Sequence, residues 1–277
     1  MVQEAQDSNS LENLVPLIRN LTIQLNEALK NENIYSDFAT QLLNASEALS
    51  EKMSGDFLKV LKHAEKLVDS AGTCQELSDF GFTESGMYPI DPDGHKVGAE
   101  PIMVHCNFTT NTTEIIHDHD KEEIEMKKCE KLFNGEGCYK TSFEYDAPLS
   151  QIIALTNQSK SCEQDVKFHC FLAPLMEYGS KHLGFWLDRN GTQQTFFHGN
   201  FNESHTCQCG INQTCLEPPL TCNCNAKIPE WLADMGKITD KNLLPVTEFA
   251  YGPMDYDIQK AKVQVGSLKC SGIKEKI

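Results

Sequence analysis

The first 73 residues of this 277-residue chain contain no cysteine, whereas the remainder contains all twelve. The chain has no uninterrupted run of 18 apolar residues, so we do not expect this sequence to span a membrane. Positive charge is also scarce, because 24 Lys and Arg residues stand against 40 Asp and Glu residues, a formal charge of −16. Since phosphate binding needs clustered Lys and Arg, this balance argues against DNA or RNA as a partner.

Catalytic signatures are missing as well. The sequence has no G-x-S-x-G, no H-E-x-x-H and no glycine loop of the kind that cradles phosphate. We therefore expect a protein that is not an enzyme, with no catalytic residue, no cofactor and no bound metal. Separately, the first ten residues lack the basic and apolar regions of a signal peptide.

The cysteines are confined to one region and are even in number, which predicts a disulfide-bonded domain from an oxidising compartment. We expect all twelve in disulfides: Cys74, Cys106, Cys129, Cys138, Cys162, Cys170, Cys207, Cys209, Cys215, Cys222, Cys224 and Cys270. Extended segments at 87–90 and 101–108 are expected to pair, so that a bond between Cys74 and Cys106 ties their hairpin to the end of the preceding helix. Cys129 and Cys138 are a plausible local pair.

Two C-x-C pairs, at 207–209 and 222–224, are a separate question. Four such sulfurs can bind zinc, which is the alternative to disulfides. Neighbouring strand positions point to opposite faces, so the two members of a C-x-C pair rarely bond to each other. We expect each pair to bond elsewhere, and one pair bonding to the other is an option.

Eight N-x-S/T sequons accompany the cysteines and favour a glycosylated protein that is secreted or displayed on the cell surface. They begin at Asn20, Asn44, Asn107, Asn111, Asn157, Asn190, Asn202 and Asn212.

The cysteine-free segment carries a helical pattern. Its apolar residues step by three and four, as in a coiled coil, through Leu11, Leu14, Ile18, Leu21, Leu25 and Ala28. The seam continues to Leu67 but is broken at several polar positions. Residues 1–71 are therefore expected to be either a coiled coil that makes the chain a homo-oligomer or two amphipathic helices that fold back. From Thr73 onward the helical period stops.

Two acidic motifs invite a metal. In the stretch IDPDG, Asp91 and Asp93 flank Pro92, and Gly94 follows. Since a calcium loop needs five or six oxygen ligands in order, we expect a tight turn with Pro92 at its second position. His117 and His119 of HDHD could bind a metal, but their highly charged surroundings favour a solvated segment.

Three further elements are expected beyond these motifs. Residues 145–156 and 229–236 are predicted to be short amphipathic helices that pack on a sheet. The apolar and polar alternation around Asn190–Gly191 predicts a β-hairpin that includes Trp186.

A resemblance to a known family emerges from these motifs. The series CQEL…ESGMYPIDPDG…PIMVHCN is similar to the opening of a fibrinogen-like domain. YDAPLSQIIALTNQSKSCEQDVKFHC, CQCGINQTCLEPPLTCNCNA, LPVTEFAYGPMD and VGSLKCSG resemble stretches of the contactin-associated proteins, a neurexin-like group of cell-adhesion proteins. Together these motifs cover residues 72–273. The calcium loop and the tryptophan-rich pocket of fibrinogen-like lectins have no counterpart here, so they are not carried over.

A weaker similarity links SQIIAL…VKFHC and LPVTEFA…VGSLKC to the C-propeptides of fibrillar collagens. This similarity implies a bond between Cys170 and Cys270. It also suggests that the globular domain itself drives chain association.

The sequence as a whole predicts an α+β protein. A helical stalk at 1–71 would precede a disulfide-rich, fibrinogen-like domain at 72–277 with a mainly antiparallel sheet. We expect an extracellular adhesion or recognition protein that binds a protein or glycan ligand and presents several heads on one stalk. The alternative is a matrix assembly module whose globular domain trimerises.

Overall fold

A computed structural model describes residues 71–94, 97–129, 137–177, 181–199 and 207–274. All of them belong to one compact unit that spans Val68–Ile277. The predicted helical stalk at 1–71 lies outside the described residues apart from Ala71, which is buried. None of the described helices combines the length and the apolar character that crossing a bilayer requires.

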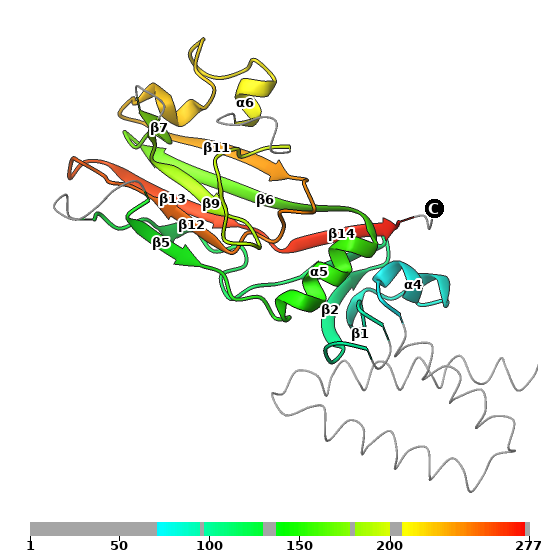
Figure 1. Cartoon of the computed structure of the whole chain (residues 1–277). Coiled ribbons are helices and arrows are strands. Elements are labelled where there is room, and N and C mark those ends of the chain that lie inside the picture. Colours follow the sequence, from blue (N-terminus) through cyan, green and yellow to red (C-terminus); the bar gives the residue numbers. More distant parts are fainter. Residues whose placement is uncertain (1–70, 95–96, 130–136, 178–180, 200–206, 275–277) are drawn as a thin grey trace, which may run out of the picture. The chain divides into compact units, whose positions relative to one another are not determined.

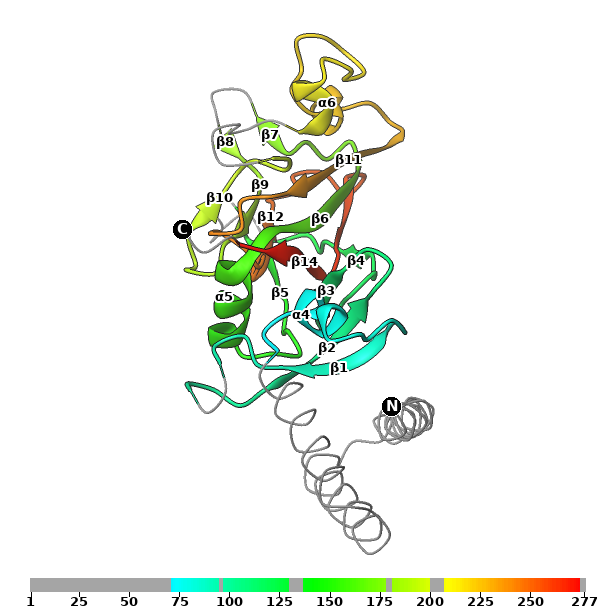
Figure 2. The same ribbon diagram turned by 90° about the vertical axis from the view of Figure 1, so that its right-hand side faces the viewer.

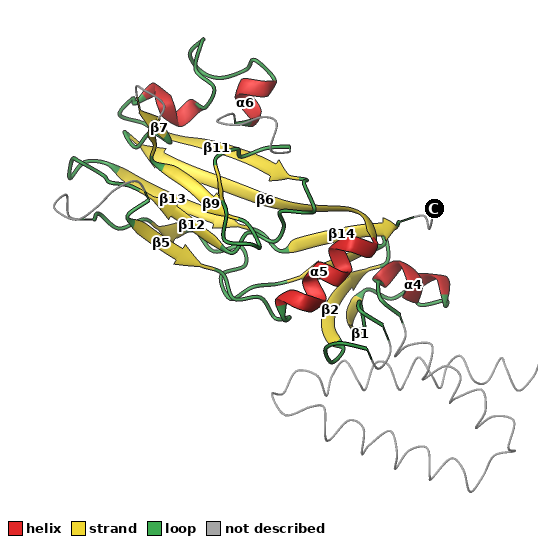
Figure 3. Ribbon diagram, viewed as in Figure 1, coloured by secondary structure: helices red, strands yellow, loops and turns green. Residues whose placement is uncertain are grey.

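Strands are the main regular secondary structure of the described domain (Figures 1 and 3). The larger sheet has eight strands: β1 (Gly86–Ile90), β2 (Ile102–Asn107), β3 (Thr112–Ile115), β4 (Ile124–Glu125), β6 (Ser159–Phe171), β11 (Trp231–Ile238), β13 (Lys260–Val265) and β14 (Leu268–Ile273). A four-stranded sheet contains β5 (Tyr139–Ser142), β9 (Gly184–Leu187), β10 (Gln193–Gln194) and β12 (Glu248–Tyr251). Strands β7 (Met176–Glu177) and β8 (Lys181–His182) form a separate pair.

Strand β6 is the centre of the larger sheet. Its 13 residues alternate between buried and more exposed positions over most of their length, which is the pattern of a strand with one face on a core. On one side it pairs with β11, and on the other side β13 and then β14 follow it in turn, all antiparallel. The predicted antiparallel sheet is confirmed, including the hairpin of β1 and β2.

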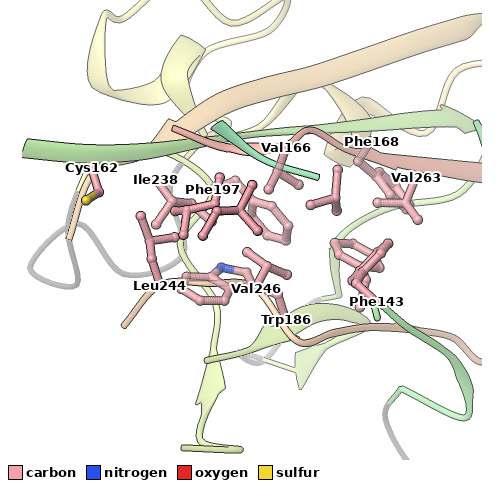
Figure 4. Close-up of a cluster of buried hydrophobic side chains, with 14 of the residues drawn as sticks. Phe143, Cys162, Val166, Phe168, Trp186, Phe197, Ile238, Leu244, Val246 and Val263 are labelled. Atoms are coloured by element: carbon pink, nitrogen blue, oxygen red, sulfur yellow. The ribbon is translucent and has the colours of Figure 1, made fainter. Parts of the chain in front are cut away.

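The core lies between the inward faces of the two sheets. Figure 4 shows Val166 and Phe168 of β6 near Trp186 of β9, with Leu244 and Val246 from the segment before β12. The Trp186 side chain is fully buried, and its Nε1 donates a hydrogen bond of 2.7 Å to the carbonyl of Phe196. The predicted hairpin at Asn190–Gly191 is confirmed, because β9 and β10 flank it.

The expected α+β class is wrong. The described residues contain only three short α-helices, α4 (Cys74–Asp79), α5 (Leu149–Gln158) and α6 (Gln208–Ile211), and a 3-10 helix, η3 (Asn223–Ala226). Strands far apart in the sequence pair with β6 instead, so the domain is a curled, mainly antiparallel β structure. Figure 2 shows α6 at the opposite end of the domain from β1 and β2.

Two local predictions fail in opposite directions. A further helix, α4, follows Thr73 where none was expected, because the Thr73 hydroxyl accepts a hydrogen bond from the Glu76 amide and caps it. Residues 231–238 form strand β11 rather than the predicted helix over 229–236. The reason is pairing, since all eight residues of β11 lie opposite β6. The predicted helix at 145–156 is present as α5, within slightly later bounds.

Candidate recognition surface

Every cysteine of the chain is in a disulfide. The bonds join Cys74–Cys106, Cys129–Cys138, Cys162–Cys270, Cys170–Cys224, Cys207–Cys222 and Cys209–Cys215. The first two are the pairs that the sequence predicted. The C-x-C pairs are indeed linked to each other, through Cys207 and Cys222. Twelve paired cysteines fit a segment that folds in an oxidising compartment.

The expected bond between Cys170 and Cys270 is wrong, and the sheet register explains why. In the antiparallel pairing Val265 lies opposite Val166, so residues further along the chain lie opposite progressively earlier residues of β6. Cys270 therefore faces Cys162, with 4.1 Å between their Cα atoms. Cys170 lies opposite Ala261 and bonds to Cys224 of η3 instead.

Asp234 of β11 is buried beside the disulfide between Cys207 and Cys222. Its two carboxylate oxygens accept hydrogen bonds of 2.8 Å from the amides of Asn223 and Cys224. Burial raises the pKa of Asp234 above its ordinary value. Cys207, Cys222 and Asp234 lie close enough together to hold a metal, but the two sulfurs are bonded to each other and offer no thiolate to zinc.

The aspartates of the IDPDG corner serve the turn itself. The Gly94 amide donates to the Asp91 carbonyl, which closes a turn with Pro92 at its second position, as predicted. The side chain of Gln151 reaches between the aspartates, and its Nε2 lies 3.3 Å from Asp91 Oδ1 and 3.0 Å from Asp93 Oδ1. Burial, reinforced by the hydrogen bond to Asp93, raises the pKa of Asp91, whereas the Ala99 amide lowers the pKa of Asp93.

Gln151 is a key residue that sequence reasoning missed. It is fully buried on α5, where the amphipathic pattern suggested only packing against the sheet. Its Nε2 also lies 3.0 Å from each of the carbonyls of Ala99 and Glu100. Four oxygens therefore surround a group with two hydrogens, and the amide joins the corner to the helix.

The two histidines of HDHD have separate roles. His117 is buried, its Nε2 lies 3.1 Å from the Val265 carbonyl, and its Nδ1 accepts the amide of His119. Burial lowers the pKa of His117. The His119 ring instead pairs with Glu122 at 2.9 Å, and this bond raises the pKa of His119. Both nitrogens of His117 are thus engaged within the fold.

The sequons occupy several faces of the domain. Asn157, Asn190 and Asn212 are exposed, whereas Asn107 and Asn111 are half-buried near the β2–β3 turn. Asn20, Asn44 and Asn202 lie outside the described residues. Glycosylation of these positions stays a prediction.

The described surface has a cleft of about 230 Å³ at the end of β6 and β13. Its lining is mainly apolar and includes Leu172, Pro174, Leu183, Lys227, Pro253, Asp255, Tyr256, Ile258 and Gln259. Tyr256 and Ile258 are 69% and 56% exposed, which is unusual for large apolar side chains. Gln259 holds the walls together, since its Nε2 donates to the Leu172 carbonyl and its Oε1 accepts the Tyr256 amide.

This cleft is smaller than the pockets of about 300–1,000 Å³ that hold drug-sized ligands. Its size instead suits a single apolar side chain, which is how a partner protein anchors an interface. We take the cleft and its exposed rim as the candidate recognition site of a disulfide-bonded antiparallel β domain.

Comparison with known proteins finds sequence relatives over 68% of the chain. The chain is 31% identical over 192 residues, 68% of its length, to contactin-associated protein 1 of Rattus norvegicus. The same protein of Mus musculus and that of Homo sapiens match equally, at 31% over 192 residues. The matched region is 14% of the rat protein and 13% of the other two, so the chain corresponds to a small part of these relatives. No family model matches the chain.

Proposed function

We propose that this chain is a non-enzymatic, extracellular recognition domain that binds another protein in cell adhesion. The observation that carries the proposal is the similarity to contactin-associated protein 1 over 192 residues. The six disulfides support an extracellular location, and the exposed sequons are accessible for glycosylation. The apolar cleft supports a protein ligand. The finer assignment to fibrinogen-like domains rests on the motifs quoted above.

The name of the relatives states an association with a contactin, so a contactin ectodomain is the first probe to use. We expect the full chain, secreted from eukaryotic cells, to bind that ectodomain in a surface-immobilised assay. A double variant, Tyr256→Ala with Ile258→Ala, should weaken binding because it removes the apolar rim of the cleft.

The matched control is Val97→Ala with Leu216→Ala, since these side chains are also exposed but do not line the cleft. If the control weakens binding as much as the cleft variant does, the cleft is not the recognition site. If the secreted wild-type chain binds no contactin, this choice of partner is wrong.

The oligomeric state stays a prediction. Assembly through residues 1–71 would present several heads and raise avidity without new contacts. Assembly through residues 72–277 would make the chain a matrix module. The solution mass of the full chain and of residues 68–277 separates these cases, because only the second leaves the shorter piece oligomeric.

A further inference from the structure

The outer face of the larger sheet carries exposed apolar and basic side chains together. On β11, Trp231 and Met235 are 50% and 53% exposed. Cross-strand pairing places Trp231 opposite Phe171, and Phe171 opposite Lys260. Four residues further along β11, Met235 lies opposite Lys167. The buried residues of β6, such as Val166 and Phe168, point the other way, into the core.

Five of these residues, together with Lys262, define what we call the outer patch: Trp231, Met235, Phe171, Lys167, Lys260 and Lys262. Lys262 Nζ lies 5.7 Å from the centre of the Trp231 ring, which is within cation–π range. Directly opposed side chains of neighbouring strands are about 5 Å apart, so the patch is continuous.

The basic groups of the patch are only partly neutralised. Lys262 lies 3.1 Å from Glu123, which also meets His169 at 3.3 Å, and Glu125 is opposite Lys262 on β4. In the described part of the chain, neither Lys167 nor Lys260 lies within ion-pair distance of a carboxylate. Two lysines therefore remain available to an anionic group.

We propose that the outer patch docks an acidic segment of a partner protein, with an apolar side chain against Trp231 and carboxylates on Lys167 and Lys260. This inference deepens the proposed recognition function and rests on it. The net charge of −16 opposes an acidic partner at long range. Beyond about 8 Å, however, salt at physiological strength screens such charges, so the nearby lysines decide.

Other occupants fit the patch less well. Sugar recognition needs free polar side chains, yet the amide of Gln264, in the same face of β13, is already donated to the Lys121 carbonyl at 2.9 Å. None of the five described sequon asparagines belongs to β6, β11 or β13, so glycans attached there would start outside the patch.

The two tryptophans of the chain make a direct test possible, because Trp186 is fully buried and Trp231 is half-exposed. Acrylamide quenching of the full chain therefore reports whether Trp231 is covered. The probe is a short glutamate-rich peptide with a central phenylalanine, and its counterpart has lysine in place of glutamate. We expect the acidic peptide alone to protect Trp231, and Trp231→Phe to remove the signal.

Lys167→Glu with Lys260→Glu should weaken binding of the acidic peptide by about tenfold, because each lost attraction becomes a repulsion. The matched control is Lys121→Glu with Lys160→Glu, which makes the same charge change at exposed positions outside the patch. Equal binding of both variants would overturn the proposal.

Four other results would also overturn it. The first is that the basic peptide or sialyllactose protects Trp231 from acrylamide, and the second is that the acidic peptide does not. The third is that protection of Trp231 rises with protein concentration alone, and the fourth is that Trp231 is already protected in the dilute chain without peptide. The last two would mean that a second copy or another part of the same chain covers the patch. None of these quenching and peptide-binding measurements depends on contactin binding. A chain that does not bind contactin would therefore contradict the proposed partner without contradicting the proposal for the outer patch.

Discussion

At the scale of single residues, Gln151 shows how a neutral amide keeps two carboxylates together. Its Nε2 contacts both Asp91 and Asp93 from a fully buried position. Gln151→Glu would replace that donor with a third carboxylate. We expect a loss of at least about 1–3 kcal/mol in the free energy of unfolding at pH 7, the cost of unsatisfied buried polar groups.

This loss should shrink as the pH falls, since protonation of the new carboxyl restores a donor. The folded state then binds more protons than the unfolded state, so its stability relative to the wild type decreases as pH rises. Urea denaturation at several pH values measures the effect. Gln193→Glu, at an exposed position of β10, is the control, and a similar loss there would contradict this role of Gln151.

His117 gives a second pH dependence of opposite sign. Burial lowers its pKa below the ordinary value of 6.5, so the unfolded state binds more protons just below pH 6.5. The stabilisation that comes from keeping His117 neutral in the folded state is therefore fully present above pH 6.5. It is lost as the pH falls below 6.5 towards the lowered pKa of the folded state. We expect His117→Gln to flatten the slope of unfolding free energy against pH between 5 and 6.5.

His169 has a pKa that burial lowers in the same way, so part of the slope should survive in the His117 variant. The double variant His117→Gln with His169→Gln should remove more of it. An unchanged slope in both variants would place the titrating groups elsewhere.

At the scale of elements, Gly236 lets a loop run against strand β11. The Gly199 amide donates to the Lys237 carbonyl, and the Thr239 amide donates to the Gly199 carbonyl. A Cβ at Gly236 would collide with the Phe197 carbonyl oxygen, which is backbone and cannot swing away. We expect Gly236→Ala to cost about 1–3 kcal/mol of stability, as overpacking does.

Gly266→Ala is the matched control, because its Cβ would meet Asp165 only at 3.6 Å, an ordinary contact. Thermal denaturation of both variants compares them directly. Equal melting temperatures would show that the loop moves aside at little cost.

The elements also show what the sequence can predict. Alternation between apolar and polar residues, with turn residues at Asn190–Gly191 and Pro92, is local information, and those strands and turns were predicted correctly. The segment at 229–236 was misread because Trp231, Leu232 and Met235 are spaced as on a helix face. Only pairing with β6, about 65 residues earlier in the chain, makes it a strand.

Register and surface patches depend on the same distant pairings. The Cys162–Cys270 bond follows from the order in which β13 and β14 pass β6, which no local pattern reveals. The cleft and the outer patch likewise join residues from separate strands and loops. The cysteines and sequons could be found from the sequence, but the recognition surfaces could not.

At the scale of the whole molecule, the disulfides differ in the length of chain that they close. Cys162 and Cys270 are 108 residues apart, whereas Cys209 and Cys215 are 6 apart. In the chain-entropy model these bonds contribute about 5 and about 2 kcal/mol. We expect Cys162→Ala with Cys270→Ala to lower the free energy of unfolding more than Cys209→Ala with Cys215→Ala does.

Chemical denaturation of the two double variants under non-reducing conditions measures the difference. The result would contradict the entropy argument if the short loop proved the more important one. The cavity left by the buried Cys162 and Cys270 side chains adds to the expected loss.

The same bond has a mechanical consequence. In the proposed adhesion role the domain would be pulled through its two ends, and the outermost cysteines, Cys74 and Cys270, are both cross-linked. Tension that enters at Cys270 crosses directly to Cys162, so the 107 residues between them carry no load. Most of β6, all of β11 and β13, and the cleft lie within that shielded stretch, while the segment between Cys106 and Cys162 is stretched first. Both surfaces proposed for recognition would therefore keep their shape under a force that unravels the rest of the domain.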